Sequence, residues 1–208
     1  MVVNVILILL TGVGNMIKLP EPLKDSNFSL ERAINERRSI RSYQDKPLTL
    51  KEVSQLLWAS QGIVASGKRA APSAGATYPM EIYIMVGNVD GLKAGFYKYH
   101  NKEHAIELVK EGDLRKAISD RALRQDMILK APVTIVIAAV FERTRARYGA
   151  RAERYVYMEA GHIGQNIMLQ ATALGLGTVP VGAFIDSEVK SVLGISEDPL
   201  YLFPVGWK

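Results

Sequence analysis

The sequence contains no cysteine and only three histidines, His100, His104 and His162. Without cysteine the chain can form no disulfide, no cysteine-ligated cluster and no thiolate nucleophile. No carboxylate joins the histidines at the spacing of a recognisable metal site, so we expect neither a zinc nor a non-haem iron centre. The sequence therefore predicts no metal site.

Strong charge is also absent. The net charge of +5 and the isoelectric point near 9.3 favour anionic ligands such as phosphates, but they are too mild to indicate nucleic acid by themselves. Because 48% of the 208 residues are hydrophobic, the composition predicts a folded domain with a substantial core. No repeat, low-complexity tract or linker divides residues 16–208, which we expect to form one domain.

Residues 1–15 differ from the rest, because positions 2–14 form an apolar run without a charge. The run is shorter than the ~20 residues that span a bilayer, and it lacks the basic start of a secretory signal. Two interpretations carry equal weight: the true start is Met16, or the run is a short apolar arm that packs on a partner. A membrane anchor is less favoured, so we expect a cytoplasmic protein, with membrane association through residues 1–15 left open.

Hydrophobic periodicity and turn residues predict an α+β fold. Helices are expected at 29–36, from 49 onward, at 113–123, 151–174 and 186–193, with N-terminal caps at Ser29, Thr49 and Asp113. Strands are expected at 81–86, 95–99, 105–109, 132–140 and 200–205, the second and third forming a hairpin. Helices come first and are followed by mixed strands and helices, which is typical of α+β folds rather than regular β-α-β repeats.

The helix expected at 151–174 is the longest, and Gly175 caps its end. Gly161 and Gly164 lie inside it, where each glycine costs roughly 1 kcal/mol against alanine, so we expect another backbone to approach closely. We predict a fully buried central helix. On it, Glu159 is expected to pair with an arginine and His162 to be a hydrogen-bonded core residue.

An arginine cluster, Arg37-Arg38-Ser39-Ile40-Arg41, follows the first predicted helix. Three guanidinium groups and a hydroxyl within five residues can surround a phosphate dianion, since arginine presents a planar fork of donors. The alternative is a solvated basic helix end. The position between a helix and the extended segment 42–47 favours the binding site, because the side chains can converge there.

Two segments of small residues could approach a flat ring system. The first, APSAGATYP at 71–79, leads into a strand, and the second, GLGTVPVGAF at 175–184, follows the long helix. The alternatives are an ordinary surface loop and a helix cap with a buried strand. A dinucleotide-binding motif would place G-x-G-x-x-G between a strand and a helix, whereas Gly175-x-Gly177 follows a helix.

Together these segments resemble the nitroreductase family of FMN enzymes. The pieces RRSIR, PSAGATYP, EAGHIGQN and LGLGTVPVGAF occur in order within residues 29–206. The GFYKY segment, His104 and the PSAGATYP form resemble the SagB-type dehydrogenase branch most closely. The resemblance implies a central, mostly antiparallel sheet flanked by helices, in an intertwined homodimer with FMN at the interface.

The resemblance also implies the cofactor-binding residues. In chain order they are Arg37, Arg38, Ser39, Arg41, Pro72, Ser73, Ala74, Gly75, Pro180, Val181, Gly182 and Lys208. The group from Arg37 to Arg41 would hold the phosphate, ribityl chain and pyrimidine edge, with Arg38 acting through its main chain. Pro72–Gly75 would reach the flavin from the opposite subunit. Pro180–Gly182 would line the ring near N5, and Lys208 would reach the phosphate.

Some positions depart from classical nitroreductases. Ala76 and Tyr78-Pro79-Met80 stand where many members carry Asn and Gln-Pro-Trp, which weakens the transfer of nitroaromatic activity. The 208-residue chain also lacks the additional domains typical of peptide-modifying dehydrogenases, which argues against azoline oxidation.

The expected reaction is ping-pong hydride transfer from NADH or NADPH to a small organic acceptor such as a nitro compound or a quinone. It requires no catalytic acid or nucleophile. Tyr78 and Tyr97 are conceivable proton donors, but we expect core or interface roles for both. Gln165 and Asn166 could contact the cofactor or satisfy buried backbone.

Three alternatives are kept. The chain could bind flavin without turnover, or act as a SagB-type dehydrogenase on a peptide-derived substrate. It could also bind nucleic acid through the arginines at 143, 145, 147, 151 and 154. Those arginines alternate with Glu142 and Glu153 and have no aromatic stacking platform, so a solvated, salt-bridged arm is favoured over a nucleic-acid site.

Overall fold

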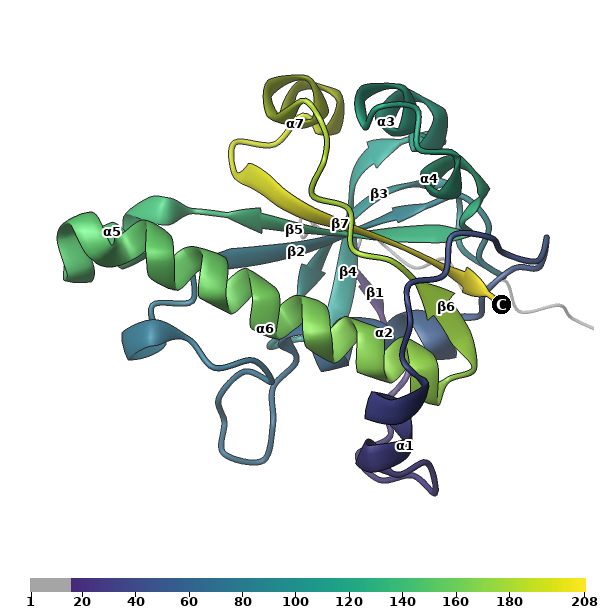
Figure 1. Cartoon of the computed structure of the whole chain (residues 1–208), viewed down its shortest axis with the longest axis horizontal. Coiled ribbons are helices and arrows are strands. Elements are labelled where there is room, and N and C mark those ends of the chain that lie inside the picture. The colour runs from purple at the N-terminus through teal and green to yellow at the C-terminus, as the bar shows by residue number, and fades with distance from the viewer. Residues whose placement is uncertain (1–15) are drawn as a thin grey trace, which may run out of the picture.

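The computed structural model describes residues 16–208, so the expectations about residues 1–15 lie outside the described residues. A seven-stranded sheet forms its centre, in the order β1-β4-β3-β2-β5-β7-β6, and each pairing is antiparallel (Figure 1). The strands are β1 Met16–Lys18, β2 Met80–Val86, β3 Gly95–His100, β4 Ala105–Glu111, β5 Val133–Ala139, β6 Leu176–Thr178 and β7 Asp198–Trp207.

Helices cover both faces of the sheet (Figure 1). They are α1 Leu30–Glu36, α2 Leu50–Gln61, α3 Arg115–Arg121, α4 Asp126–Lys130, α5 Phe141–Tyr148, α6 Ala152–Ala173 and α7 Asp186–Leu193. Helices α2 and α6 pack on one face, whereas α3, α4 and α7 pack on the other. The predicted α+β class is therefore confirmed. Within residues 16–208 none of these helices has the length and apolarity to cross a membrane.

The β-branched run of β5 is explained by burial on both faces. Ile135 and Ile137 belong to the core beneath α2 and α6, whereas Val136 and Ala138 belong to the core beneath α3, α4 and α7. Because successive side chains point to opposite faces, a strand between two helical layers needs apolar residues at every position.

Helix α2 begins as the sequence predicts. The Thr49 backbone N–H donates to Glu52 Oε2 at 2.7 Å, and the Thr49 side chain accepts in return, which completes the capping box. Helix α1 has the predicted Ser29 cap, but its apolar face is only partly covered. Ala33 is buried, whereas Leu30 is 61% and Ile34 is 56% exposed.

The prediction of a fully buried α6 is wrong. One face packs closely on the sheet: a Cβ on Gly164 would lie 2.6 Å from Phe203 Cζ. The other face is open, with Tyr157 56% and Met158 53% exposed and no described residue within 4 Å of a Cβ built on Gly161. Among residues 16–208, the close approach expected at both glycines therefore occurs only at Gly164.

Several boundaries also differ from the predictions. Helix α3 begins at Arg115 with Leu114 as its N-cap, so Asp113 is not the cap, although its Oδ1 accepts from the Arg115 N–H at 3.0 Å. It ends before Leu123 and Arg124, whose φ angles of 55° and 58° lie in the left-handed region. Strand β1 and helices α4 and α5 were not predicted as separate elements, because each is short or highly polar, whereas β6 is the buried strand kept as the alternative interpretation of residues 175–184.

Candidate functional site

The arginine cluster starts where α1 ends. The Arg37 N–H donates to Ala33 O at 3.0 Å and closes the helix, and the chain then runs beside β6. Ser39 forms a parallel bridge with Thr178, and the Ile40 N–H donates to Thr178 O at 2.9 Å. The cluster is thereby fixed beside the end of β6.

The guanidinium groups of this cluster are available for a ligand. Within residues 16–208 none of Arg37, Arg38 and Arg41 forms an ion pair. Arg37 is half-buried, and the other two arginines and Ser39 are exposed. Unpaired like charges held close together repel one another, so an anion bound among them would be stabilised.

Glycine at position 177 lets the cluster approach β6. A Cβ on Gly177 would lie 2.6 Å from Ile40 Cγ2, so a larger residue would push the two segments apart. The Tyr43 hydroxyl donates to Ile40 O at 2.9 Å and holds the backbone of the cluster in place. Burial raises the pKa of Tyr43 well above its usual range and keeps this hydroxyl protonated.

The segment Pro180–Gly182 lies beside the same site. Val181 exchanges two backbone hydrogen bonds with Leu202 of β7, at 2.9 and 3.0 Å. Val181 is buried, Pro180 is half-buried and Gly182 is exposed. Because Thr178 contacts the arginine cluster, the structure brings the first and third predicted groups together.

The C-terminus reaches the same edge of the sheet, because Trp207 and Gly206 pair with Leu176 and Gly177 of β6. Lys208 is exposed, and its carbonyl oxygen accepts from Gln44 Nε2 at 2.7 Å. Its side chain is thus available to a ligand at this edge, and its contact with a phosphate stays a prediction.

The loop that contains Pro72–Gly75 is held in an unusual backbone conformation. Gly75, Ala76 and Tyr78 have φ angles of 57°, 54° and 45°, all left-handed. The Ser73 hydroxyl accepts from the Tyr78 N–H at 2.9 Å and closes the loop. Left-handed non-glycine residues cost free energy and cluster at functional sites, so the loop is built for a specific shape.

Side chains of helix α5 hold this loop through hydrogen bonds. Arg147 Nη1 donates to Gly75 O at 3.0 Å, and Arg143 Nη1 donates to Tyr78 O at 3.0 Å. The Thr77 and Thr144 hydroxyls lie 2.9 Å apart. A side chain at Gly75 would collide with the Tyr148 hydroxyl, 2.5 Å from the position of its Cβ.

The loop and the arginine cluster lie near opposite ends of α6 (Figure 1). The loop contacts α5, which precedes α6, whereas the cluster contacts β6, which follows it. A helix of 22 residues is about 33 Å long. One chain therefore does not unite the second predicted group with the first and third.

Two predictions on α6 are wrong. Glu159 is 2% exposed and forms no ion pair with an arginine; instead Gln61 Nε2 donates to its Oε1 at 3.2 Å. Burial raises the pKa of Glu159 to about 6, against the lowering effects of Ser73, Gln61 and the charge of Arg69. His162 is exposed rather than a core residue.

The two open questions about polar helix residues receive different answers. Asn166 Nδ2 donates to Ala59 O at 3.1 Å and so satisfies backbone, whereas Gln165 is exposed. Tyr97 is a core residue whose hydroxyl donates to Lys93 O at 2.8 Å. The Tyr78 ring lies beneath the guanidinium of Arg69, 4.5 Å from its Cζ.

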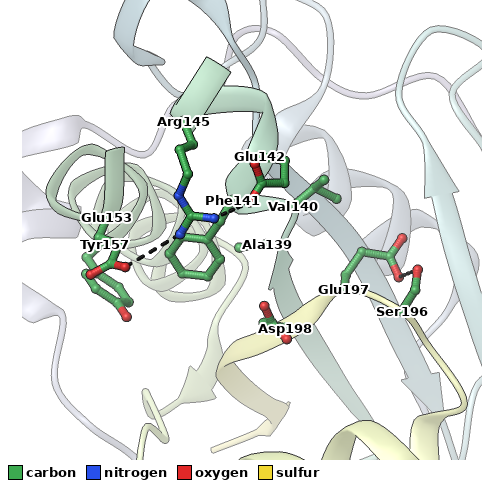
Figure 2. A pocket seen from close by; sticks show the side chains of 10 residues that line it. All are labelled: Ala139, Val140, Phe141, Glu142, Arg145, Glu153, Tyr157, Ser196, Glu197 and Asp198. Atoms are coloured by element: carbon green, nitrogen blue, oxygen red, sulfur yellow. Dashed lines mark hydrogen bonds and ion pairs between the residues drawn. The ribbon is translucent and has the colours of Figure 1, made fainter. Parts of the chain in front are cut away.

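The arginines expected in a solvated arm lie on a helix. Arg145 of α5 points between Glu142 and Glu153, at the wall of a cavity of about 570 Å³ whose other wall carries Glu197 and Asp198 (Figure 2). The predicted salt bridges are therefore present. The segment is helix α5 rather than an arm, and on it Arg143 pairs with Glu81 and Arg147 donates to Gly75 O.

The structure contains a Ser–His pair that was not predicted from the sequence. Ser54 Oγ lies 2.7 Å from His104 Nε2, and His104 Nδ1 lies 2.8 Å from the Tyr99 hydroxyl. Ser54 is 1% exposed and donates to Pro20 O, which makes it unreachable as a nucleophile. The pair instead ties the segment before α1 to α2 and the hairpin.

Comparison with known proteins identifies the fold family. A profile of the Nitroreductase family matches residues 34–207. The chain belongs to the nitroreductase family. A protein of Methanocaldococcus jannaschii that carries the nitroreductase name is 47% identical over 182 residues, which are 87% of this chain and 92% of that protein. Membership confirms the predicted enzyme class, an FMN-dependent oxidoreductase of the nitroreductase type.

Solved structures agree. A crystal structure from Anabaena variabilis with the same family name has a TM-score of 0.82 at 30% identity, over 93% of this chain and 42% of that chain. One from Ralstonia eutropha has a TM-score of 0.81 at 29% identity, over 94% of this chain and 91% of that chain. The nitroreductase-like fold is thereby confirmed.

More distant relatives bear on the branch of the family. The Microcin B17-processing protein McbC of Escherichia coli is 26% identical, over 82% of this chain and 64% of that protein. The FMN reductase (NAD(P)H) of Bacillus subtilis is 25% identical, over 84% of this chain and 61% of that enzyme. The first relative supports the predicted placement near the SagB-type branch.

Proposed function

We propose that this protein binds FMN at an interface between two identical subunits and transfers hydride from NADH or NADPH to a small organic acceptor. The observation that carries the proposal is the cluster of unpaired guanidinium groups at Arg37, Arg38 and Arg41, anchored beside Pro180–Gly182. An anionic cofactor with a flat ring suits a phosphate-binding cluster next to a small-residue segment.

The chemistry of the chain's residues suits FMN. Arg37 and Arg41, with the Ser39 hydroxyl, would hold the phosphate and the polar edge of the cofactor, and Lys208 is near enough to the same sheet edge to assist. Gly177 keeps the cluster against β6, since a Cβ would meet Ile40 at 2.6 Å. The exposed backbone of Gly182 can approach the ring without a side chain in the way.

When bound, FMN would supply the hydride chemistry for both half-reactions, the oxidation of NAD(P)H and the reduction of the acceptor. The residues of the site would bind and orient the cofactor rather than donate a proton themselves.

A homodimer would complete the site. The exposed face of α6 carries the apolar Tyr157 and Met158 and the small Gly161 beside the polar His162 and Gln165. Leu30 and Ile34 of α1 are apolar and exposed as well. Two copies related by a twofold axis and joined along α6 would place the loop end of one copy near the cluster end of the other. Pro72, Ser73, Ala74 and Gly75 would then close the site from the second subunit.

The direct experiment is the visible spectrum of the purified protein after incubation with FMN. We expect a yellow protein that bleaches on anaerobic addition of NADH or NADPH and regains its colour with a quinone or a nitro compound. A protein that stays colourless with excess FMN contradicts the proposal. One that binds FMN but never bleaches supports the alternative, flavin binding without turnover.

A second candidate is oxidation of a peptide-derived substrate, favoured by the similarity to the Microcin B17-processing protein. The chain spans 64% of that relative, so the comparison leaves a third of the relative unmatched. Reoxidation of the flavin by oxygen during turnover of an azoline peptide would distinguish this activity from acceptor reduction.

A further inference from the structure

A buried carboxyl group lies beneath the loop that contains Pro72–Gly75 and takes no part in the proposed flavin chemistry. Glu159 of α6 faces Gln61 of α2, whose Nε2 donates to Glu159 Oε1 at 3.2 Å. Both residues are almost fully buried, at 2% and 1% exposed. Within residues 16–208, Glu159 Oε2 and Gln61 Oε1 are buried oxygens without a hydrogen-bond partner.

A single proton would satisfy both oxygens. An ionised carboxylate and an amide oxygen are both acceptors, so neither can serve the other. A carboxylic acid, by contrast, can donate from Oε2 to Gln61 Oε1 while it accepts from Gln61 Nε2 at Oε1. Leaving two buried acceptors unpaired is costly, whereas this acid–amide pair leaves none.

We propose that Glu159 is a positioning residue that holds a proton on Oε2, and that the resulting acid–amide pair with Gln61 fixes α6 against α2 beneath the loop that contains Ser73. On ionisation the O–H bond breaks and the proton leaves to solvent. Gln61 Oε1 then loses its donor, and the carboxylate is drawn toward positive charge and hydroxyl donors.

The groups around the carboxyl make the loop sensitive to this proton. The Ser73 hydroxyl of the loop and the charge of Arg69 both act on Glu159 and favour its ionised form. Arg69 is itself influenced by Glu81 of β2 and Arg143 of α5. Arg69 Nη1 donates to Met80 O at 3.2 Å, at the far end of the loop. Burial outweighs Arg69 and raises the pKa of Glu159 to about 6.

The first test needs no cofactor. Infrared spectra of the protein, recorded as a pH titration, are subtracted from those of Glu159→Gln, with Glu153→Gln as the control on an exposed carboxylate of the same helix. We expect a protonated-carboxyl band that is missing only in Glu159→Gln and that persists about 1.5 pH units above the ordinary glutamate range. Absence of such a band above a pH of about 5 overturns the proposed proton.

The second test connects the proton to the loop and rests on the proposed function. FMN dissociation constants are measured between pH values of about 5 and 8 for wild type, Glu159→Gln and Glu153→Gln. The glutamine amide can keep the paired arrangement at every pH, and titration of the FMN phosphate affects all three proteins equally. We expect the ratio of the wild-type constant to that of Glu159→Gln to rise with pH, by a factor on the order of ten.

Glu153→Gln should follow wild type throughout. A ratio that stays constant with pH overturns the link between the carboxyl and the loop. If no variant binds FMN at any pH, the proposed function fails, while the infrared titration still decides whether Glu159 holds the proton.

Discussion

At the scale of single residues, the site depends on charges that form no ion pair among residues 16–208. Arg37 and Arg41 follow α1, whereas the nearby Arg32 is already paired with Glu36 at 2.7 Å. Arg37 and Arg41 are therefore available to a ligand, whereas Arg32 forms an ion pair within α1. Arg32 also provides a matched control, because it lies one or two turns away on the same segment.

Replacing Arg37 or Arg41 by alanine should weaken FMN binding by roughly ten- to a hundred-fold each, the usual effect of a lost hydrogen bond to a charged group. Arg32→Ala should change the dissociation constant by less than about threefold. Titration of flavin fluorescence measures both. Equal effects of the three substitutions would contradict the assignment of the cluster to the phosphate.

Glu159 should also make the fold less stable as the pH rises. Its folded pKa of about 6 is raised above the ordinary value of 4.5, so the folded protein binds more protons than the unfolded chain between these values. The stabilisation is complete below 4.5 and is lost as the pH rises through about 6, by about 2 kcal/mol in total. Urea unfolding at several pH values should show this loss in wild type and not in Glu159→Gln.

The residue types of the site could be recognised from the sequence, but their partners could not. The cluster 37–41 was found because three arginines in five positions are unusual. The roles of Glu159 and His162 were predicted wrongly, because which face of a buried helix meets solvent depends on neighbours that are remote in sequence. No local pattern indicated that Gln61, 98 positions away, would face Glu159.

At the scale of elements, the long strands and helices could be predicted from the sequence, whereas the short or polar ones could not. Periodicity predicted the long strands and helices, since their apolar repeats reflect one or two buried faces. Periodicity missed α5, because its sequence FERTRARY is too polar to show an apolar face. This helix is held in place by contacts to Glu81, Gly75 and Tyr78. Short elements such as β1 and β6 depend on pairing with distant strands.

The contact between α6 and β7 gives an element-scale prediction. Gly164→Ala should lower the free energy of unfolding by about 1–3 kcal/mol, because its Cβ would lie 2.6 Å from Phe203 Cζ, although alanine favours helix. Phe203→Leu should relieve the collision, so the double variant should lose less stability than the sum of the single ones. Strict additivity in chemical denaturation would show that the two residues do not collide.

At the scale of the whole molecule, one chain carries two half-sites that cannot meet. The loop is held by α5, which precedes the 22-residue helix α6, and the arginine cluster by β6, which follows it. Gly161, with nothing within 4 Å of its Cβ position, and the exposed Tyr157 and Met158 offer a surface for a second copy. The sequence predicted this division only through its resemblance to a family, because no local pattern tells which copy supplies a loop.

Mixing two inactive variants tests this division most directly. One variant carries Arg37→Ala and Arg41→Ala, and the other carries Ala74→Trp to block the loop; neither should bind FMN alone. After unfolding and refolding together, half of the dimers should be mixed, each with one intact site, so FMN binding should return to about a quarter of the wild-type level. If both half-sites belonged to the same chain, the mixture would bind no more FMN than the two variants measured separately.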